Sequence, residues 1–223
     1  MWKKYFILLI TLSNILISCN KNNREETYWD ACQTETPIAC DTLALMFQKG
    51  YDVKKDMKKA KKYYDIACQR GVDQSCYKLM EIYEQEGEKQ KEEKYRSILL
   101  KLYHQGCTEG KSDFCNSVAV IYANQKNFKM ALEMIEKGLK IAPNNAHLFY
   151  NDACIKSLQN KPVQAISSLE KFMKMEKSTS KQKKIEMIQK DSDFDGIRNS
   201  QEFKKFMRAE QDKKNDGKQE EKE

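Results

Sequence analysis

The stretch "ACQRGVDQSC", residues 67–76, contains two cysteines with seven residues between them. The same gap occurs three times along the chain, in the pairs Cys32 and Cys40, Cys68 and Cys76, and Cys107 and Cys115. A spacing that recurs at intervals of 20 to 50 residues is the signature of a repeated structural unit. The cysteine spacing therefore predicts a structural unit that is repeated along the chain.

Two chemistries could explain paired cysteines, namely metal binding and disulfide formation. Zinc sites favour two to four residues between paired ligands and often include histidine. Here the gap is seven residues, and the only histidines are His104 and His147. We therefore predict disulfides. Six cysteines allow many pairings, and the repetition makes the three local pairings the simplest choice.

The first 19 residues, "MWKKYFILLITLSNILISC", combine a charged start, an apolar run and small residues before a cysteine. This pattern predicts an export signal, and the run is short for a spanning helix, which needs roughly 20 apolar residues. The closing L-I-S-C resembles the lipobox of bacterial lipoproteins. That resemblance implies cleavage before Cys19 and a diacylglyceryl group on its sulfur. The alternative is an ordinary secretory signal, and in either case disulfides can persist outside the cytosol.

The apolar residues that follow each second cysteine step by three and four. Leu43, Ala44 and Phe47 form one such stripe, which is typical of an amphipathic helix. Gly50 and Gly71 stand where helices should end. The predicted unit is thus a helix, a turn and a second helix, about 36 residues long. One unit cannot bury its apolar face alone, but stacked units can.

The pattern A-x-x-Y-Y-x-x-A-C-x-x-G at residues 60–71 closely resembles the Sel-like repeat (SLR), a relative of the tetratricopeptide repeat. The cysteine pairs resemble those of its cysteine-rich branch. The resemblance implies that each pair joins the second helix of one repeat to the first helix of the next. It also leaves open an enzymatic role, because some proteins of that branch are described as β-lactamases.

Further along, Tyr122, Ala131, Gly138 and Pro143 match positions of a tetratricopeptide repeat. The segment from residue 149 to 173 is similar to a common variant of that repeat but departs from it at Asp152 and Lys156. Apolar residues usually occupy those two positions, so we expect weaker packing or an exposed face there.

These observations predict an all-α fold, a right-handed α-solenoid of SLR- and tetratricopeptide-type helix hairpins. The expected segments are a signal peptide (1–18), a tether (19–28), disulfide-linked Sel-like repeats (29–124), tetratricopeptide-like repeats (112–176, sharing the helix 112–124), a capping segment (177–208) and a disordered charged tail (209–223).

The concave face of such a solenoid binds peptides or protein partners. The tetratricopeptide register gives these groove candidates: Asp113, Asn116, Val120, Ala123, Asn124, His147, Tyr150 and Ser157. Cys154 is expected either as a free thiol on that face or as a buried small residue. His104 is expected on the surface or between helices.

A candidate metal loop lies near the C-terminus. Asp191, Asp193, Asp195 and Glu202 fit the spacing of a calcium-binding loop. The same segment resembles a closing motif that follows the last tetratricopeptide repeat. In that interpretation Phe194, Ile197 and Phe203 pack on the final helix, and the aspartates cap the next helix. We expect the cap and no metal, with calcium as the alternative.

The remaining features favour binding over catalysis. The net charge of +7 is spread among many acidic residues, and no aromatic and basic alternation indicates nucleic-acid binding. Ser178 and Lys181 have the S-x-x-K spacing of penicillin-recognising serine enzymes, but no S-D-N or K-T-G partner is present.

We therefore predict a non-catalytic lipoprotein without a cofactor, anchored on the outward side of a bacterial membrane, at the periplasmic face or the cell surface. Its repeats would bind a protein or peptide partner. The alternatives are a weak β-lactamase or other hydrolase, and an envelope assembly factor for outer-membrane proteins or pili.

Overall fold

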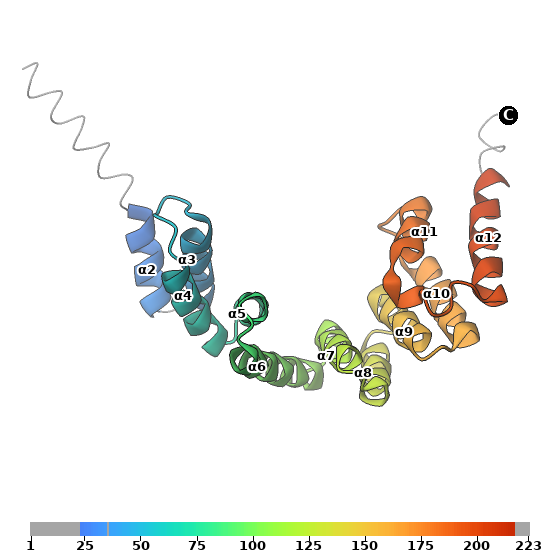
Figure 1. The fold of residues 1–223 in the computed structure, drawn as a ribbon, viewed down its shortest axis with the longest axis horizontal. Coiled ribbons are helices and arrows are strands. Elements are labelled where there is room, and N and C mark those ends of the chain that lie inside the picture. Colours follow the sequence, from blue (N-terminus) through green and yellow to red (C-terminus); the bar gives the residue numbers. More distant parts are fainter. Residues whose placement is uncertain (1–22, 35, 217–223) are drawn as a thin grey trace, which may run out of the picture. The chain divides into compact units, whose positions relative to one another are not determined.

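The computed structural model describes residues 23–34 and 36–216 (Figure 1). Every regular element within these ranges is a helix, which confirms the predicted all-α fold class. None of these helices combines the length and the apolar character that a membrane span needs. The expected signal peptide, residues 1–18, and the expected lipidation site, Cys19, lie outside the described residues.

The chain forms two compact units, with the boundary between Leu102 and Tyr103. The helices of the first unit are α2 (Asn23–Thr34), α3 (Pro37–Lys49), α4 (Met57–Gln69), α5 (Asp73–Gln85) and α6 (Lys89–Thr108), the last of which contains the boundary. Short turns join them into hairpins, so that α3 packs on both α2 and α4, and α4 packs on α5. Aromatic pairs such as Phe47 and Tyr63, whose ring centroids lie 5.7 Å apart, fill these contacts.

The second unit continues the same construction. Its helices are α7 (Ser112–Asn124), α8 (Phe128–Ile141), α9 (Ala146–Leu158), α10 (Pro162–Met175), α11 (Lys181–Lys190), the 3-10 helix η1 (Ser192–Phe194) and α12 (Gln201–Asp216). Two hairpins, α7 with α8 and α9 with α10, share a core because α9 also packs on α7 and α8. The segment after α10 covers α9 and α10 through η1 and α12.

The three predicted disulfides are confirmed. Cα atoms of the paired cysteines lie 4.6 to 4.7 Å apart, and each bond joins the end of one helix to the first turn of the next. The bridged turns are tight. Gly71, between α4 and α5, has φ 90° and Gly110, between α6 and α7, has φ 85°, a left-handed conformation that favours glycine. All six sulfurs belong to buried residues.

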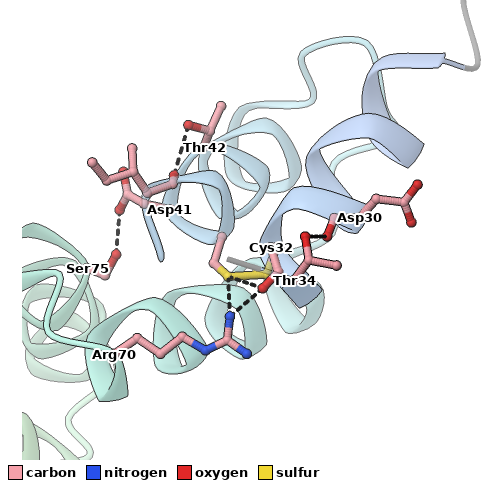
Figure 2. The surroundings of a disulfide bond; sticks show 9 residues. Asp30, Cys32, Thr34, Asp41, Thr42, Arg70 and Ser75 are labelled. Carbon is pink, nitrogen blue, oxygen red and sulfur yellow. Dashed lines mark hydrogen bonds between the residues drawn. A yellow bond between two sulfur atoms is a disulfide. The ribbon is translucent and has the colours of Figure 1, made fainter. Parts of the chain in front are cut away.

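Figure 2 shows that the first disulfide is also a contact between repeats. The Arg70 guanidinium, at the end of α4, donates a hydrogen bond to the Cys32 carbonyl and lies 3.9 Å from the Cys40 sulfur. Beside it, Ser75 Oγ donates to Asp41 Oδ1 at 2.6 Å. The turn that carries one disulfide therefore packs on the helices joined by the previous one.

Both ends of the helical region extend beyond their expected limits. Residues 23–28 were expected in a tether, but they begin α2, whose first turn holds Glu25 and Glu26 at the end that favours negative charge. Residues 209–216 were expected in a disordered tail, but they continue α12. The Glu210 carboxylate lies 3.4 Å from Lys181 Nζ, which ties this part of α12 to α11.

The capping segment matches its predicted packing but not all of its predicted caps. Phe194, Ile197 and Phe203 are 0%, 1% and 3% exposed and belong to one core with α9 and α10. Asp191 caps η1 by accepting a bond from the Asp193 amide. At α12 the aspartate prediction is wrong, because Ser200 Oγ accepts from the Phe203 amide at 3.1 Å.

The expected weak packing at Asp152 and Lys156 does not occur. Asp152 is only 8% exposed, and its carboxylate accepts hydrogen bonds from Lys156 Nζ and Ser168 Oγ, both at 2.5 Å. The two charged residues are four apart on α9, which places them on one face. Ser168 of α10 completes the group, so polar contacts replace the usual apolar ones.

Removing one bridge tests how much it stabilises the fold. We expect the double variant Cys68→Ser, Cys76→Ser to lose about 2 kcal/mol of unfolding free energy, because the reduced chain regains the entropy of a short closed loop. Urea denaturation followed by circular dichroism measures this. With reductant present the wild type and the variant should unfold alike. A difference that persists in reductant would show that the substitutions act through packing instead.

Candidate binding surface

The candidate surface is the side of α7 and α9 that faces away from the core. Along α7, Asp113, Val120 and Asn124 are exposed, and they recur at intervals that place them on one face. At the start of α9, His147 is exposed as well. The structure thus brings four of the predicted groove residues to the surface of two helices that pack together.

Two amide hydrogen bonds fix α7 and α9 beneath this surface. Asn145, the N-cap of α9, donates to Asp113 Oδ1 at 2.9 Å. Asn151 donates to Asn116 Oδ1 at 2.7 Å, so the half-buried Asn116 is a bridge between helices. Asn145 also donates to Ser112 Oγ at 3.3 Å and accepts from the His147 amide at 3.0 Å, so the two helices are held in place by several polar contacts.

Three predicted groove residues do not lie on an open surface. Ser157 is 1% exposed, and a Cβ at Gly196 would lie 3.7 Å from its carbonyl oxygen, so the capping segment covers it. Tyr150 is half-buried between the rings of Phe172 and Phe194. Ala123 packs against the core of the second unit. The repeat register does not predict the segment that closes over Tyr150 and Ser157, because that segment lies outside the repeats.

The equivalent face in the first unit carries exposed apolar side chains that the sequence analysis missed. Relative to its bridging cysteine, Leu45 of α3 occupies the position of Val120 in α7, and Ile38 occupies that of Asp113. Ile38 is 66% exposed and Leu45 is 39% exposed, and they lie two turns apart on one face. Tyr77 of α5, 46% exposed, corresponds to Asn116. The 36- and 39-residue intervals would have identified all three.

Cys154 lies in a buried polar cluster with the capping segment. It is 5% exposed, forms no disulfide, and its sulfur lies 3.9 Å from Asp191 Oδ2. The same carboxylate oxygen accepts a bond from Tyr150 Oη at 2.5 Å. Burial and then the carboxylates of Asp191 and Asp193 raise the pKa of the Cys154 thiol far above its ordinary value. The thiol therefore stays protonated, and Cys154 contributes to the packing of the core rather than acting as a nucleophile.

The same cluster bears on the calcium alternative. In the described part of the chain, Cys154, Asp191 and Asp193 are the acidic, histidine or cysteine side chains close enough to share an ion, with ligand atoms within 4.8 Å of one another. Asp195 instead pairs with Arg198 at 2.7 Å. Glu202 lines a hollow of about 700 Å³ between α10 and α12. The four predicted ligands are therefore not brought together.

Two further candidates have structural partners. Ser178 Oγ donates to Glu176 Oε1 at 2.5 Å, while Lys181 pairs with Glu210. The hydrogen bond of the Ser178 hydroxyl is therefore made with a glutamate and not with the lysine of the S-x-x-K motif. His104 Nε2 lies 3.0 Å from the hydroxyl of Tyr122, which places it between α6 and α7, as one of its two interpretations predicted. Neither arrangement forms a nucleophile with its base.

Comparisons with known proteins identify related folds. No family model matches the sequence, and no curated protein matches it. Among solved structures, BtubC (BKLC) from P. vanneervenii is similar over 88% of this chain and 90% of its own, with 14% identity and a TM-score of 0.55. At that identity the similarity supports the helical fold alone.

Two repeat proteins are also similar. A Sel1 repeat protein from Oxalobacter formigenes is similar over 84% of this chain and 78% of its own, with 15% identity and a TM-score of 0.48. The antigen c5321 of uropathogenic Escherichia coli, which displays an SLR fold, is similar over 83% of this chain and 40% of its own, with 17% identity and a TM-score of 0.48. Each disulfide of this chain joins the end of one helix to the first turn of the next. This arrangement fits the cysteine-rich Sel-like pattern independently of the structural similarities above.

The raised pKa of the Cys154 thiol predicts low reactivity. In a soluble form that begins at residue 20, iodoacetamide at pH 8 should leave Cys154 unmodified, since only a thiolate attacks and this thiol is buried and protonated. In guanidinium the same residue should be alkylated, as mass spectrometry would show. The matched control is Asn124→Cys, an exposed position that should react without denaturant. Equal rates at the two positions would refute a closed cluster.

Proposed function

We propose that this chain is a lipid-anchored envelope protein whose helix hairpins bind a protein or peptide partner. The observation that carries the proposal is the exposed apolar pair on one face of α3, Ile38 and Leu45, with Tyr77 exposed on α5 of the same unit. Exposed apolar side chains that share one helix face, rather than lying scattered singly, mark an interaction surface.

The opposite faces of the same helices are fully used by the fold. On α3, Leu43, Ala44 and Phe47 are 0% to 3% exposed and form the core. Ile38 and Leu45 thus contribute little to stability, and covering them with a partner would remove apolar area from water. Helical repeats present such surfaces to extended or helical peptides.

The two units offer different chemistry to a partner. The first presents Ile38, Leu45 and Tyr77, which suit apolar or aromatic side chains. The second presents Asp113, Asn124 and His147, which suit hydrogen-bonding groups and cations. We infer that the segment bound by the first unit carries apolar or aromatic anchoring residues.

The anchor is supported by the sequence motif that ends at Cys19, and the disulfides fit an exported chain. The hydrolase alternative gains no support from Ser178 and Lys181, which are held by other partners. The assembly alternative would use the same binding surface, so identifying the partner decides it.

Site-specific photocrosslinking tests the binding surface. A photoreactive amino acid at Leu45 or at Val120 should yield a partner adduct in intact cells. The matched control is position 62, an exposed lysine on α4 outside this face, which should give none. Ile38→Asp should reduce the Leu45 adduct about tenfold or more, since a buried unpaired carboxylate opposes apolar docking. Equal adducts at positions 45 and 62, or no effect of the aspartate, would contradict the assignment.

Mass spectrometry of the N-terminal peptide tests the anchor. We expect residues 1–18 to be absent and Cys19 to carry a diacylglyceryl modification. Cys19→Ser should abolish that modification and move the protein from the membrane fraction, because stable anchoring needs more than one acyl chain. An unmodified Cys19 in wild-type protein would disprove lipidation while leaving the binding surface untouched.

A further inference from the structure

One edge of the first unit is strongly positive. Residues 49–62 contain seven lysines and two aspartates. They cover the end of α3, the turn that follows it and the first half of α4. We call the exposed members at this turn the lysine edge: Lys49, Lys54, Lys55 and Lys58.

The acidic side chains of the same stretch do not neutralise this edge. Asp52 is paired with Arg24 at 3.1 Å. Asp56 caps α4 by accepting from the Lys59 amide at 3.0 Å. The first turn of α4 contains no acidic residue, although negative charge is favoured there. Within the described ranges, no ion pair engages a member of the lysine edge.

The edge lies beside the point where the chain would leave the membrane. The Arg24 and Asp52 pair joins the first turn of α2 to the turn that holds Lys54 and Lys55. Only four residue steps separate Cys19 from Asn23, where α2 begins. A chain of that length spans at most about 14 Å. A lipid on Cys19 would therefore hold this edge close to the bilayer surface.

We propose that the lysine edge binds the anionic phospholipid headgroups of the membrane in which the chain is anchored. The inference rests on the proposed anchor, and it adds a second contact with the same bilayer. Each lysine near an anionic surface contributes about 1 kcal/mol. Tyr51, 61% exposed in the same turn, is a residue type that concentrates at membrane interfaces.

This contact would orient the first unit. A lipid with a free tether leaves a domain able to rotate above the membrane. Acyl chains combined with a basic surface hold it at two places. The exposed face of α3 would then be presented at a fixed height above the bilayer, where a partner in the envelope can reach it.

Vesicle binding by the unlipidated protein tests the edge separately from the anchor. The form beginning at residue 20 keeps every described residue, and its only tryptophan is Trp29 on α2, 46% exposed. Trp29 fluorescence and vesicle sedimentation should report binding to phosphatidylcholine vesicles that contain phosphatidylglycerol. Binding should be absent with phosphatidylcholine alone and should weaken as salt is added. Equal binding to both vesicle types would overturn the proposal.

A charge-reversal pair locates the contact. Lys54→Glu, Lys55→Glu, Lys58→Glu should weaken binding to the anionic vesicles by roughly 100-fold. The matched control Lys129→Glu, Lys161→Glu, Lys183→Glu changes the net charge equally, at exposed positions of the second unit. It should retain most of the binding. Equal losses would mean that net charge alone is sensed, which refutes the edge.

The two proposals fail in different ways. If Cys19 is lipidated but the soluble form does not bind anionic vesicles, headgroup binding by the lysine edge is disproved and the proposed anchor stands. If the soluble form binds anionic vesicles through the edge but Cys19 is unmodified, the anchor is disproved. Intact disulfides and unchanged circular dichroism in both charge variants establish that each is folded.

Discussion

The fold depends on contacts between successive helix hairpins, and the disulfides are placed at those contacts. A helix hairpin of this size has too little apolar area to fold alone, so its stability comes from its neighbours. Each bond joins the last helix of one hairpin to the first helix of the next. Around the first bond, Arg70 at the end of α4 and Ser75 of α5 add polar contacts. Oxidation therefore strengthens the contacts between successive helices on which the fold depends.

The sequence predicted this part of the structure well because it is periodic. Cysteine spacing, the apolar stripe of Leu43, Ala44 and Phe47, and the glycine at position 71 all recur with one repeat length, so each reinforces the others. The same periodicity predicted the exposed face of α7, on which Asp113, Val120 and Asn124 lie. It would also have predicted exposed side chains at Ile38, Leu45 and Tyr77 if the groove register had been carried back to α3 and α5.

The parts that the sequence did not predict depend on contacts made only once. In the sequence, Asp152 is a charged residue at a position that is usually apolar. In the structure, its carboxylate accepts hydrogen bonds from Lys156 and Ser168. The α12 cap at Ser200 and the pairing of Glu210 with Lys181 lie in the segment after the last repeat. A repeat pattern carries no information about such positions, since it reports what the copies share.

The capping segment explains why the candidate surface differs between the units. In a repeat protein the last hairpin lacks a successor, and its exposed core must be covered. Here η1 covers it by packing on α9, where Phe194 contacts Tyr150 and the aspartate at 191 bonds to the same residue. That closure buries Tyr150, Cys154 and Ser157, which share the face that a partner would otherwise use. Of the predicted groove residues in the second unit, the exposed ones therefore lie on α7 and in the first turn of α9. In the first unit, the exposed apolar side chains Ile38, Leu45 and Tyr77 lie on α3 and α5.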